Sequence, residues 1–202
     1  MTCNYSAEEY EEEEITGLLE NYRKQLERIA DHCAERKETE LTPSDLLYSD
    51  LTIEELEELG PERISDVTPL TPMQEGMLFQ YLFDEHSEAY FTQMFFVIGG
   101  ELRVELLGQG FQCLIDRHES LRTVFKYDGD KHLQIVLKER IADFALEDLS
   151  GLEESEQQRR MELYKKEERQ AGFDLRSDLL IRTTVFRLGA ERHAVLWSTI
   201  IC

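Results

Sequence analysis

The sequence lacks the short motifs that mark the common catalytic classes. None of its five histidines is followed four residues later by an aspartate, so the H-x-x-x-D pattern of acyltransferases is missing. There is no G-x-S-x-G, no phosphate-binding glycine loop and no carboxylate pair that spacing alone would select. Residues 118–122 (HESLR) come close to the zinc motif H-E-x-x-H, but Arg122 stands where the second ligand is needed. We therefore expect no catalytic residue and no metal ligand within these 202 residues.

Positive charge is also scarce. Lys and Arg number 22 against 43 Asp and Glu, which gives a formal net charge of -21. Because a phosphate backbone is held by clustered Lys and Arg, this balance argues against nucleic acid or an anionic membrane as partner. No apolar run approaches the roughly 18 residues that span a bilayer, and residues 1–4 lead into acids rather than into a signal peptide. We expect a cytoplasmic protein.

The four cysteines, Cys3, Cys33, Cys113 and Cys202, are scattered and never form C-x-x-C, so the spacing indicates neither a zinc site nor a redox site. Cys33 and Cys113 fall on apolar faces of expected helices. A free cysteine in such a place behaves as a small hydrophobe. We expect both to fill the core.

The first 63 residues divide into a helix and a linker. Apolar side chains recur at helical spacing over residues 15–33 and predict an amphipathic helix of about five turns. Its apolar face needs another surface to pack on. Residues 37–63 read as a linker, in which Thr52 and Glu55 form a capping box that opens a short acidic helix. We expect three parts: residues 1–36, the linker 37–63, and a domain over residues 64–202.

From residue 64 onward, strands and amphipathic helices alternate. Thr71, Pro72 and Gln74 supply an N-cap, a first-turn proline and a capping-box partner, so a helix begins at Pro72. The other expected elements are a strand over 90–98, a helix over 101–118, a hairpin of 121–126 with 132–137, a helix over 153–171, and a hairpin of 179–188 with 193–201. The pattern predicts an α/β (α+β) lobe in which the helix at Pro72 and the helix ending near His118 pack on one mixed sheet.

Two motifs carry a family resemblance. Residues 70–79 (LTPMQEGMLF) and 117–125 (RHESLRTVF) resemble, in order and separation, the first two core motifs of condensation domains of nonribosomal peptide synthetases. Asp174 with residues 179–182 (LLIR) resembles the segment that leads to the family's histidine motif, and the resemblance covers roughly residues 64–199. It implies a fold like chloramphenicol acetyltransferase, with two lobes in a V around a tunnel, of which this chain supplies the N-terminal lobe.

The resemblance also bears on the residues after the last strand. In the family, a strand like residues 194–199 runs directly into His-His-x-x-x-Asp-Gly, whose second histidine lies at the reaction centre. Here the sequence reads Ile200-Ile201-Cys202. The chain is thus expected to be a fragment, cut before this motif and inactive by itself, whose partner is the missing C-terminal lobe.

The intact family member joins an upstream peptidyl thioester to a downstream aminoacyl thioester by amide formation. Both substrates are carried on phosphopantetheine arms of carrier protein domains, and no cofactor is bound directly. Residues 1–36 resemble the C-terminal tail of a preceding condensation or epimerisation domain, which implies a D-configured donor. Two alternatives stand beside this: residues 1–60 as a helical extension packed on the rest, and the whole chain as a non-catalytic docking module between synthetase subunits.

The motif residues suggest structural roles. Arg117, His118 and Arg122 lie at a helix-to-strand junction, where a guanidinium group holds carboxylates or backbone carbonyls in fixed geometry. We favour a structural role for them over a catalytic one. Arg182 lies on a core-directed strand and needs a carboxylate, because an unpaired buried charge is costly. The family resemblance implies that this partner is the aspartate of the His-His-x-x-x-Asp-Gly motif.

The helix at Pro72 offers a second set of candidates. Met73, Gln74 and Met77 are candidates for tunnel lining in the family's geometry. A methionine stripe at helical spacing is more often part of the core, so we weigh tunnel lining against core packing here.

Overall fold

The computed structural model describes residues 4–6, 8–35, 41–83, 90–129 and 131–201, so Cys3 and Cys202 lie outside it. The described chain falls into two units, residues 1–40 and 41–202. The elements are α1 (Glu12–Glu35), η1 (Pro43–Asp45), α2 (Ile53–Leu59), η2 (Pro61–Arg63), β1 (Ile64–Pro69), α3 (Pro72–Phe83), β2 (Phe91–Gly99), α4 (Val104–Arg117), η3 (Glu119–Arg122), β3 (Thr123–Lys126), β4 (Leu133–Leu137), β5 (Asp143–Asp148), α5 (Glu154–Ala171), β6 (Ile181–Gly189) and β7 (Arg192–Ile200).

The first unit contains α1, a helix of 24 residues that begins with Glu12, Glu13 and Glu14. Acidic side chains at this end are favoured by the helix dipole. None of its residues is buried, and the apolar stripe that includes Leu18, Tyr22 and Ile29 is exposed. The predicted helix is confirmed, but Cys33 is exposed, so its expected role as core filler is wrong.

The second unit contains two sheets. The smaller has the strand order β1-β4-β3 and is antiparallel. The larger has the order β2-β7-β6-β5, antiparallel except for the parallel β5–β6 pair. The α/β class and both hairpins are confirmed, whereas the expected single sheet is wrong: α4 packs on the larger sheet, and α3 bonds to β4 of the smaller one through Gln74 and Gln134.

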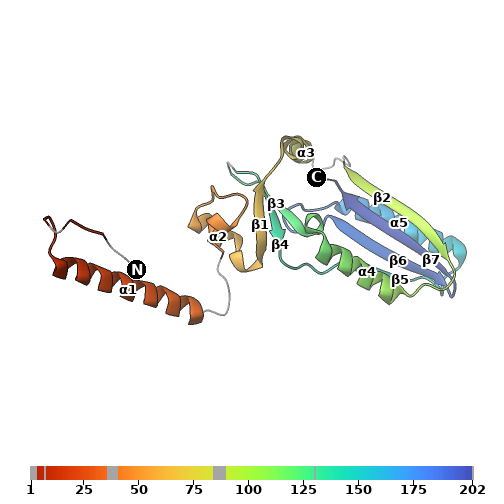
Figure 1. Ribbon diagram of the computed structural model, residues 1–202. Coiled ribbons are helices and arrows are strands. Elements are labelled where there is room, and N and C mark those ends of the chain that lie inside the picture. The colour runs from red at the N-terminus through yellow and green to blue at the C-terminus, as the bar shows by residue number, and fades with distance from the viewer. Residues whose placement is uncertain (1–3, 7, 36–40, 84–89, 130, 202) are drawn as a thin grey trace. The chain divides into compact units, whose positions relative to one another are not determined.

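The larger sheet is covered on both faces, as Figure 1 shows. Successive residues of a strand point to opposite faces. Val185 of β6 and Val195 of β7 pack with Val104 of α4, whereas Phe186 and Leu196 pack with the α5 face. The β6–β7 pair is therefore buried from two sides, and α4 and α5 lie on opposite faces.

Helix α4 turns only part of its surface to this sheet. Ile115 is buried and Phe111 makes an edge contact with Trp197, with ring centroids 5.5 Å apart. Cys113 is exposed, so its expected role as core filler is wrong, and Leu114 beside it is exposed too. Cys113 is exposed because it lies two residues after Phe111, about 200° around the helix axis, and so points away from the sheet that Phe111 contacts.

The segment expected as a linker, within its described residues 41–63, packs as part of the second unit. Leu46, Leu51 and Leu56 are buried against Ile64, Val67 and the inward side chains of β4. The capping box of α2 forms as predicted, with Glu55 N donating to Thr52 Oγ1 at 3.1 Å and Thr52 N donating to Glu55 at 2.8 Å. This segment covers one face of the small sheet.

We therefore predict that Leu56→Ala lowers the free energy of unfolding by about 3 kcal/mol, because Leu56 is 2% exposed and its removal leaves a cavity. Chemical denaturation of the 202-residue chain, followed by circular dichroism, measures the loss. Leu47→Ala is the matched control, since Leu47 is 79% exposed in the same segment and its loss should be within about 0.5 kcal/mol of zero. Equal effects of the two substitutions would contradict packing of this segment.

Candidate functional site

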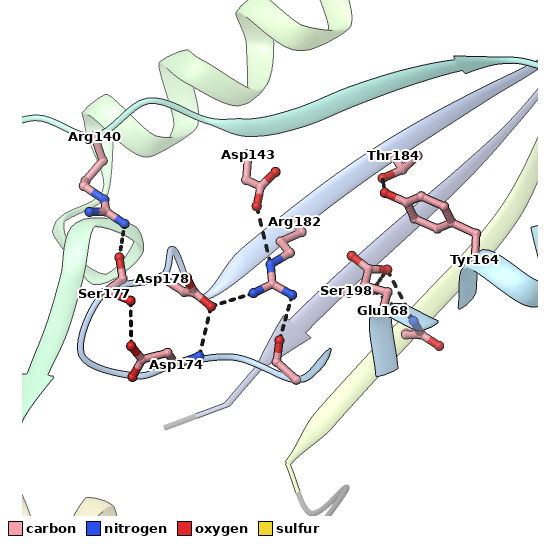
Figure 2. A network of polar contacts seen from close by, with 12 residues as sticks. Arg140, Asp143, Tyr164, Glu168, Asp174, Ser177, Asp178, Arg182, Thr184 and Ser198 are labelled. Atoms are coloured by element: carbon pink, nitrogen blue, oxygen red, sulfur yellow. Dashed lines mark hydrogen bonds and ion pairs between the residues drawn. The ribbon is translucent and has the colours of Figure 1, made fainter. Parts of the chain in front are cut away.

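A cluster of polar side chains lies at one end of the larger sheet, where β7 finishes and β6 begins. In the antiparallel register, Arg182 of β6 lies opposite Ser198 of β7, and Asp143 at the start of β5 lies opposite Arg182. Figure 2 shows these side chains together with the turn that precedes β6. This end of the sheet is the candidate site.

Arg182 is the centre of this cluster. Its Nη2 lies 2.6 Å from Asp178, its Nε lies 3.4 Å from Asp143, and its Nη1 donates to the carbonyl of Gly172 at 2.7 Å (Figure 2). The guanidinium carbon also lies 4.2 Å from the centroid of the Phe173 ring. The side chain is only 18% exposed. The expected carboxylate partner of Arg182 therefore lies within the described chain, where Asp178 and Asp143 both take this role.

The turn at residues 172–178 is tightly bonded to itself. Asp178 accepts from the backbone N–H of Asp174 at 2.9 Å, and Ser177 Oγ donates to Asp174 at 2.7 Å. The Ser177 hydroxyl is the main reason that the pKa of Asp174 is lowered from its usual value. Arg140, after β4, donates to the Ser177 carbonyl and connects this turn to the smaller sheet (Figure 2).

A second polar chain lies on the α5 face of the same sheet. Ser198, fully buried on β7, donates to Glu168 of α5 at 2.7 Å. Gln93 of β2 bonds both Ser198 and Glu168 through its amide nitrogen, and Arg169 donates to its amide oxygen at 3.0 Å. These bonds satisfy the buried Ser198 hydroxyl and attach β2 to α5. Sequence reasoning missed Ser198 and Glu168, since a lone serine and a glutamate 30 residues apart give no signal.

The motif at residues 117–122 lies elsewhere. Arg122 is buried and donates to three backbone carbonyls: that of Ile115 at 3.0 Å, that of Lys138 at 2.8 Å, and that of Leu137. It thereby joins the end of α4 to the end of β4. Arg117 and His118 are exposed at the end of α4. Arg122 and Arg182 thus belong to separate networks.

Helix α3 begins with the predicted capping box, in which Gln74 N donates to Thr71 Oγ1 at 3.3 Å and Thr71 N donates to Gln74 at 3.0 Å. Glu75 lies 2.7 Å from His132 of the neighbouring segment. Met73 is 77% exposed, which excludes core packing within the described residues, and Met77 is half-buried. Tunnel lining by Met73, Gln74 and Met77 remains a prediction.

Tyr81 connects α3 to the candidate site. Its hydroxyl donates to the carbonyl of Phe173 at 3.0 Å. Burial, with a smaller contribution from neighbouring Tyr127, raises the pKa of Tyr81 from 10.0 to about 12. The phenol therefore stays protonated and remains a donor throughout the physiological range.

The described residues contain no group of three or more His, Cys, Asp or Glu side chains placed to hold a metal ion. Within the same ranges, no helix has both the length and the apolar character needed to cross a bilayer.

Comparison with known proteins gives one consistent family. The sequence model of the condensation domain matches residues 64–199. The chain is 33% identical to bacitracin synthase 1 of Bacillus licheniformis over 96% of its own length, and 46% identical to a linear gramicidin synthase of Brevibacillus parabrevis over 69%. It spans only 4% and 3% of these relatives.

Solved structures agree on the fold. The starter condensation domain of rhizomide synthetase superposes with a TM-score of 0.60 over 67% of this chain and 34% of that one, at 15% identity. A four-domain nonribosomal peptide synthetase gives 0.57 over 68% of this chain and 10% of that one, at 14% identity. The likeness confirms the expected chloramphenicol acetyltransferase-like fold.

We predict that Arg182→Gln lowers the free energy of unfolding by about 2 kcal/mol, because the largely buried guanidinium loses its charge-assisted bonds to Asp178 and the Gly172 carbonyl. The matched control is Arg187→Gln on the same strand, whose ion pair with Asp148 is exposed and should contribute less than about 1 kcal/mol. Urea unfolding of the two variants measures the difference. Similar small losses would show that Arg182 does not hold this end of the sheet.

We also predict that Tyr81→Phe lowers the free energy of unfolding by about 1 kcal/mol at neutral pH, through loss of the bond to Phe173. Since the folded pKa of about 12 lies above 10.0, the contribution is complete below pH 10 and fades as the pH rises towards 12. Urea unfolding of both proteins at several pH values measures this. A difference that stays constant up to pH 12 would contradict the assignment.

Proposed function

The chain belongs to the condensation domain family of nonribosomal peptide synthetases, and from this premise we propose that it forms the N-terminal lobe of an amide-forming domain. In that reaction, the amine of a downstream aminoacyl thioester attacks an upstream peptidyl thioester. The C–N bond forms, the C–S bond breaks, and the donor carrier keeps a free thiol. The observation that carries the proposal is the match over residues 64–199, which ends with the strand β7.

The described geometry favours a supporting role for this lobe rather than the proton transfer itself. The 202 residues contain no His-His-x-x-x-Asp-Gly, and at the end of β7 Ser198 is bonded to Glu168 while Arg182 opposite it is bonded to Asp178. We propose that Arg182 and Glu168 hold the ends of β6 and β7 in place, so that residues following β7 in a complete domain leave the sheet in a fixed direction. A histidine there would orient or deprotonate the attacking amine.

The proposed partners are carrier protein domains, with phosphopantetheine supplied by them, and the C-terminal lobe of the condensation domain. The proposed location is the cytoplasm. Residues 1–36 are proposed as the tail of a preceding condensation or epimerisation domain. Support comes from the matches to bacitracin synthases 1 and 3, which cover 96% and 98% of this chain and so include residues ahead of the condensation match. An epimerisation tail in this position implies a D-configured donor.

A second candidate function is a docking module between synthetase subunits. The observation that favours it is α1, whose apolar stripe is exposed and which has no buried residue. An amphipathic helix of this kind is stabilised by laying its apolar face on another surface. Deleting residues 1–36 separates the two functions, because it should abolish subunit docking while leaving amide formation by a complete domain intact.

A chimaera tests the amide-forming role. Residues 64–199 would replace the matching segment of the linear gramicidin synthase, to which the chain is 46% identical over 141 residues. Loaded donor and acceptor carriers are supplied, and the dipeptidyl thioester is measured by mass spectrometry. We expect product formation within about tenfold of the parent, a loss of about 1.4 kcal/mol or less. A folded chimaera that makes no product would refute the proposal, and faster reaction of a D-configured donor would support the stereochemical part.

For the 202-residue chain alone, we predict no dipeptide above background, because it does not contain the His-His-x-x-x-Asp-Gly motif. The same carrier assay checks this, with the chimaera as the positive control. Turnover at about 1 per second or faster, a rate usual for enzymes, would show that the chain carries its own catalytic group.

A further inference from the structure

A cavity of about 450 Å³ lies away from the Arg182 cluster, beside strands β3 and β4 of the smaller sheet. It lies between the end of α2, strands β3 and β4, and the turn at residues 174–178. Its size is within the range of small-molecule pockets. Its apolar lining consists of Leu59, Val124, Phe125, Ile135 and Leu137, of which Val124, Ile135 and Leu137 belong to the buried core of the smaller sheet.

Positively charged side chains also line the cavity. Arg63, Lys126, Arg140 and Arg176 line the cavity, and they come from four separate segments of the chain. Only two carboxylates, Glu58 and Asp128, line it as well. The cavity therefore carries a formal surplus of two positive charges, in a chain whose formal net charge is -21.

Two of these four cations are paired with carboxylates of the described chain, and two are not. Arg176 is engaged with Asp128 at 2.9 Å, and Lys126 lies 3.8 Å from Glu58. Arg140 donates to a backbone carbonyl, that of Ser177. Among the described residues, Arg63 has no side-chain hydrogen bond and no ion pair, and neither Arg63 nor Arg140 is paired with a carboxylate. Two guanidinium groups thus line the cavity without a carboxylate.

We propose that this cavity binds an organic anion, a carboxylate or phosphate joined to an apolar body. Guanidinium groups bind both head groups through paired, charge-assisted hydrogen bonds. The apolar body would cover Val124, Ile135 and Leu137, while the head group faces Arg63 and Arg140. Because the chain as a whole repels anions, these local contacts, and not long-range attraction, provide the affinity. The proposal is independent of the amide-forming role.

The test uses the 202-residue chain and three probes: 4-phenylbutyrate, phenyl phosphate and the neutral 4-phenylbutanamide. Titration followed by ¹H–¹⁵N correlation spectra measures the affinity and the place of binding. We expect the anionic probes to bind with a Kd of about 1 mM and to shift the backbone signals of residues 124–126 and 176–177, and the amide to bind at least tenfold more weakly. The two anions also show which head group the cavity prefers.

Two substitutions and a control separate binding from folding. Arg63→Gln should weaken both anions about tenfold without changing the unfolding midpoint, because this side chain holds nothing else in the described structure. Lys126→Gln should weaken them by a smaller factor, because Lys126 is already paired with Glu58 at 3.8 Å. Arg28→Gln removes the same charge from α1, outside the cavity, and should leave binding unchanged.

The proposal is overturned if neither anion binds up to about 10 mM, a limit well above the expected Kd. It is also overturned if the amide binds as well as the anions, or if Arg28→Gln weakens binding as much as Arg63→Gln. The last outcome would mean that only the overall charge of the protein is being measured.

Discussion

The two-sided burial of β6 and β7 is the constraint on which the rest of this structure depends. Val185, Phe186 and Ala194 are fully buried, and Val195 and Leu196 nearly so, although neighbours along each strand point to opposite faces. Each face must therefore be covered by its own helix, α4 on one side and α5 on the other. At about 25 cal/mol for each Å² of apolar surface buried, this double cover is a large part of the stability.

Because both faces are buried, the charged side chains of β6 and β7 lie at the two ends of the sheet. Arg182 and Ser198 sit opposite each other where β6 begins and β7 ends, and each finds its partners on other elements. Arg182 holds the turn at 172–178, and Ser198 holds α5 through Glu168. These bonds attach the start of β6 to the turn at 172–178 and the end of β7 to α5.

The sequence was a good guide where the controlling forces are local. The capping boxes at Thr52 and Thr71 form as the spacing predicts, and both hairpins appear close to their expected ranges. Side-chain periodicity placed α1, α4 and α5 to within a few residues. The motifs at 70–79 and 117–125 pointed to the condensation family, and the family match over residues 64–199 includes both of them.

Only the tertiary structure decided the pairings between distant segments. The strand β5 was missed because it pairs in parallel with β6, from which α5 separates it in the chain. Cys113 is exposed because the orientation of α4 on the sheet selects which part of its apolar surface is buried. The partners of Arg182 likewise could not be predicted. The sequence indicates that a buried cation needs a carboxylate, but the chain has many acidic residues, and only the fold brings Asp143 and Asp178 to Arg182. Helix caps, hairpins and motifs depend on residues that are neighbours in the sequence, so the sequence predicts them. Which strands pair and which side chains bond depends on distances between remote segments, and these distances exist only after the sheet has formed.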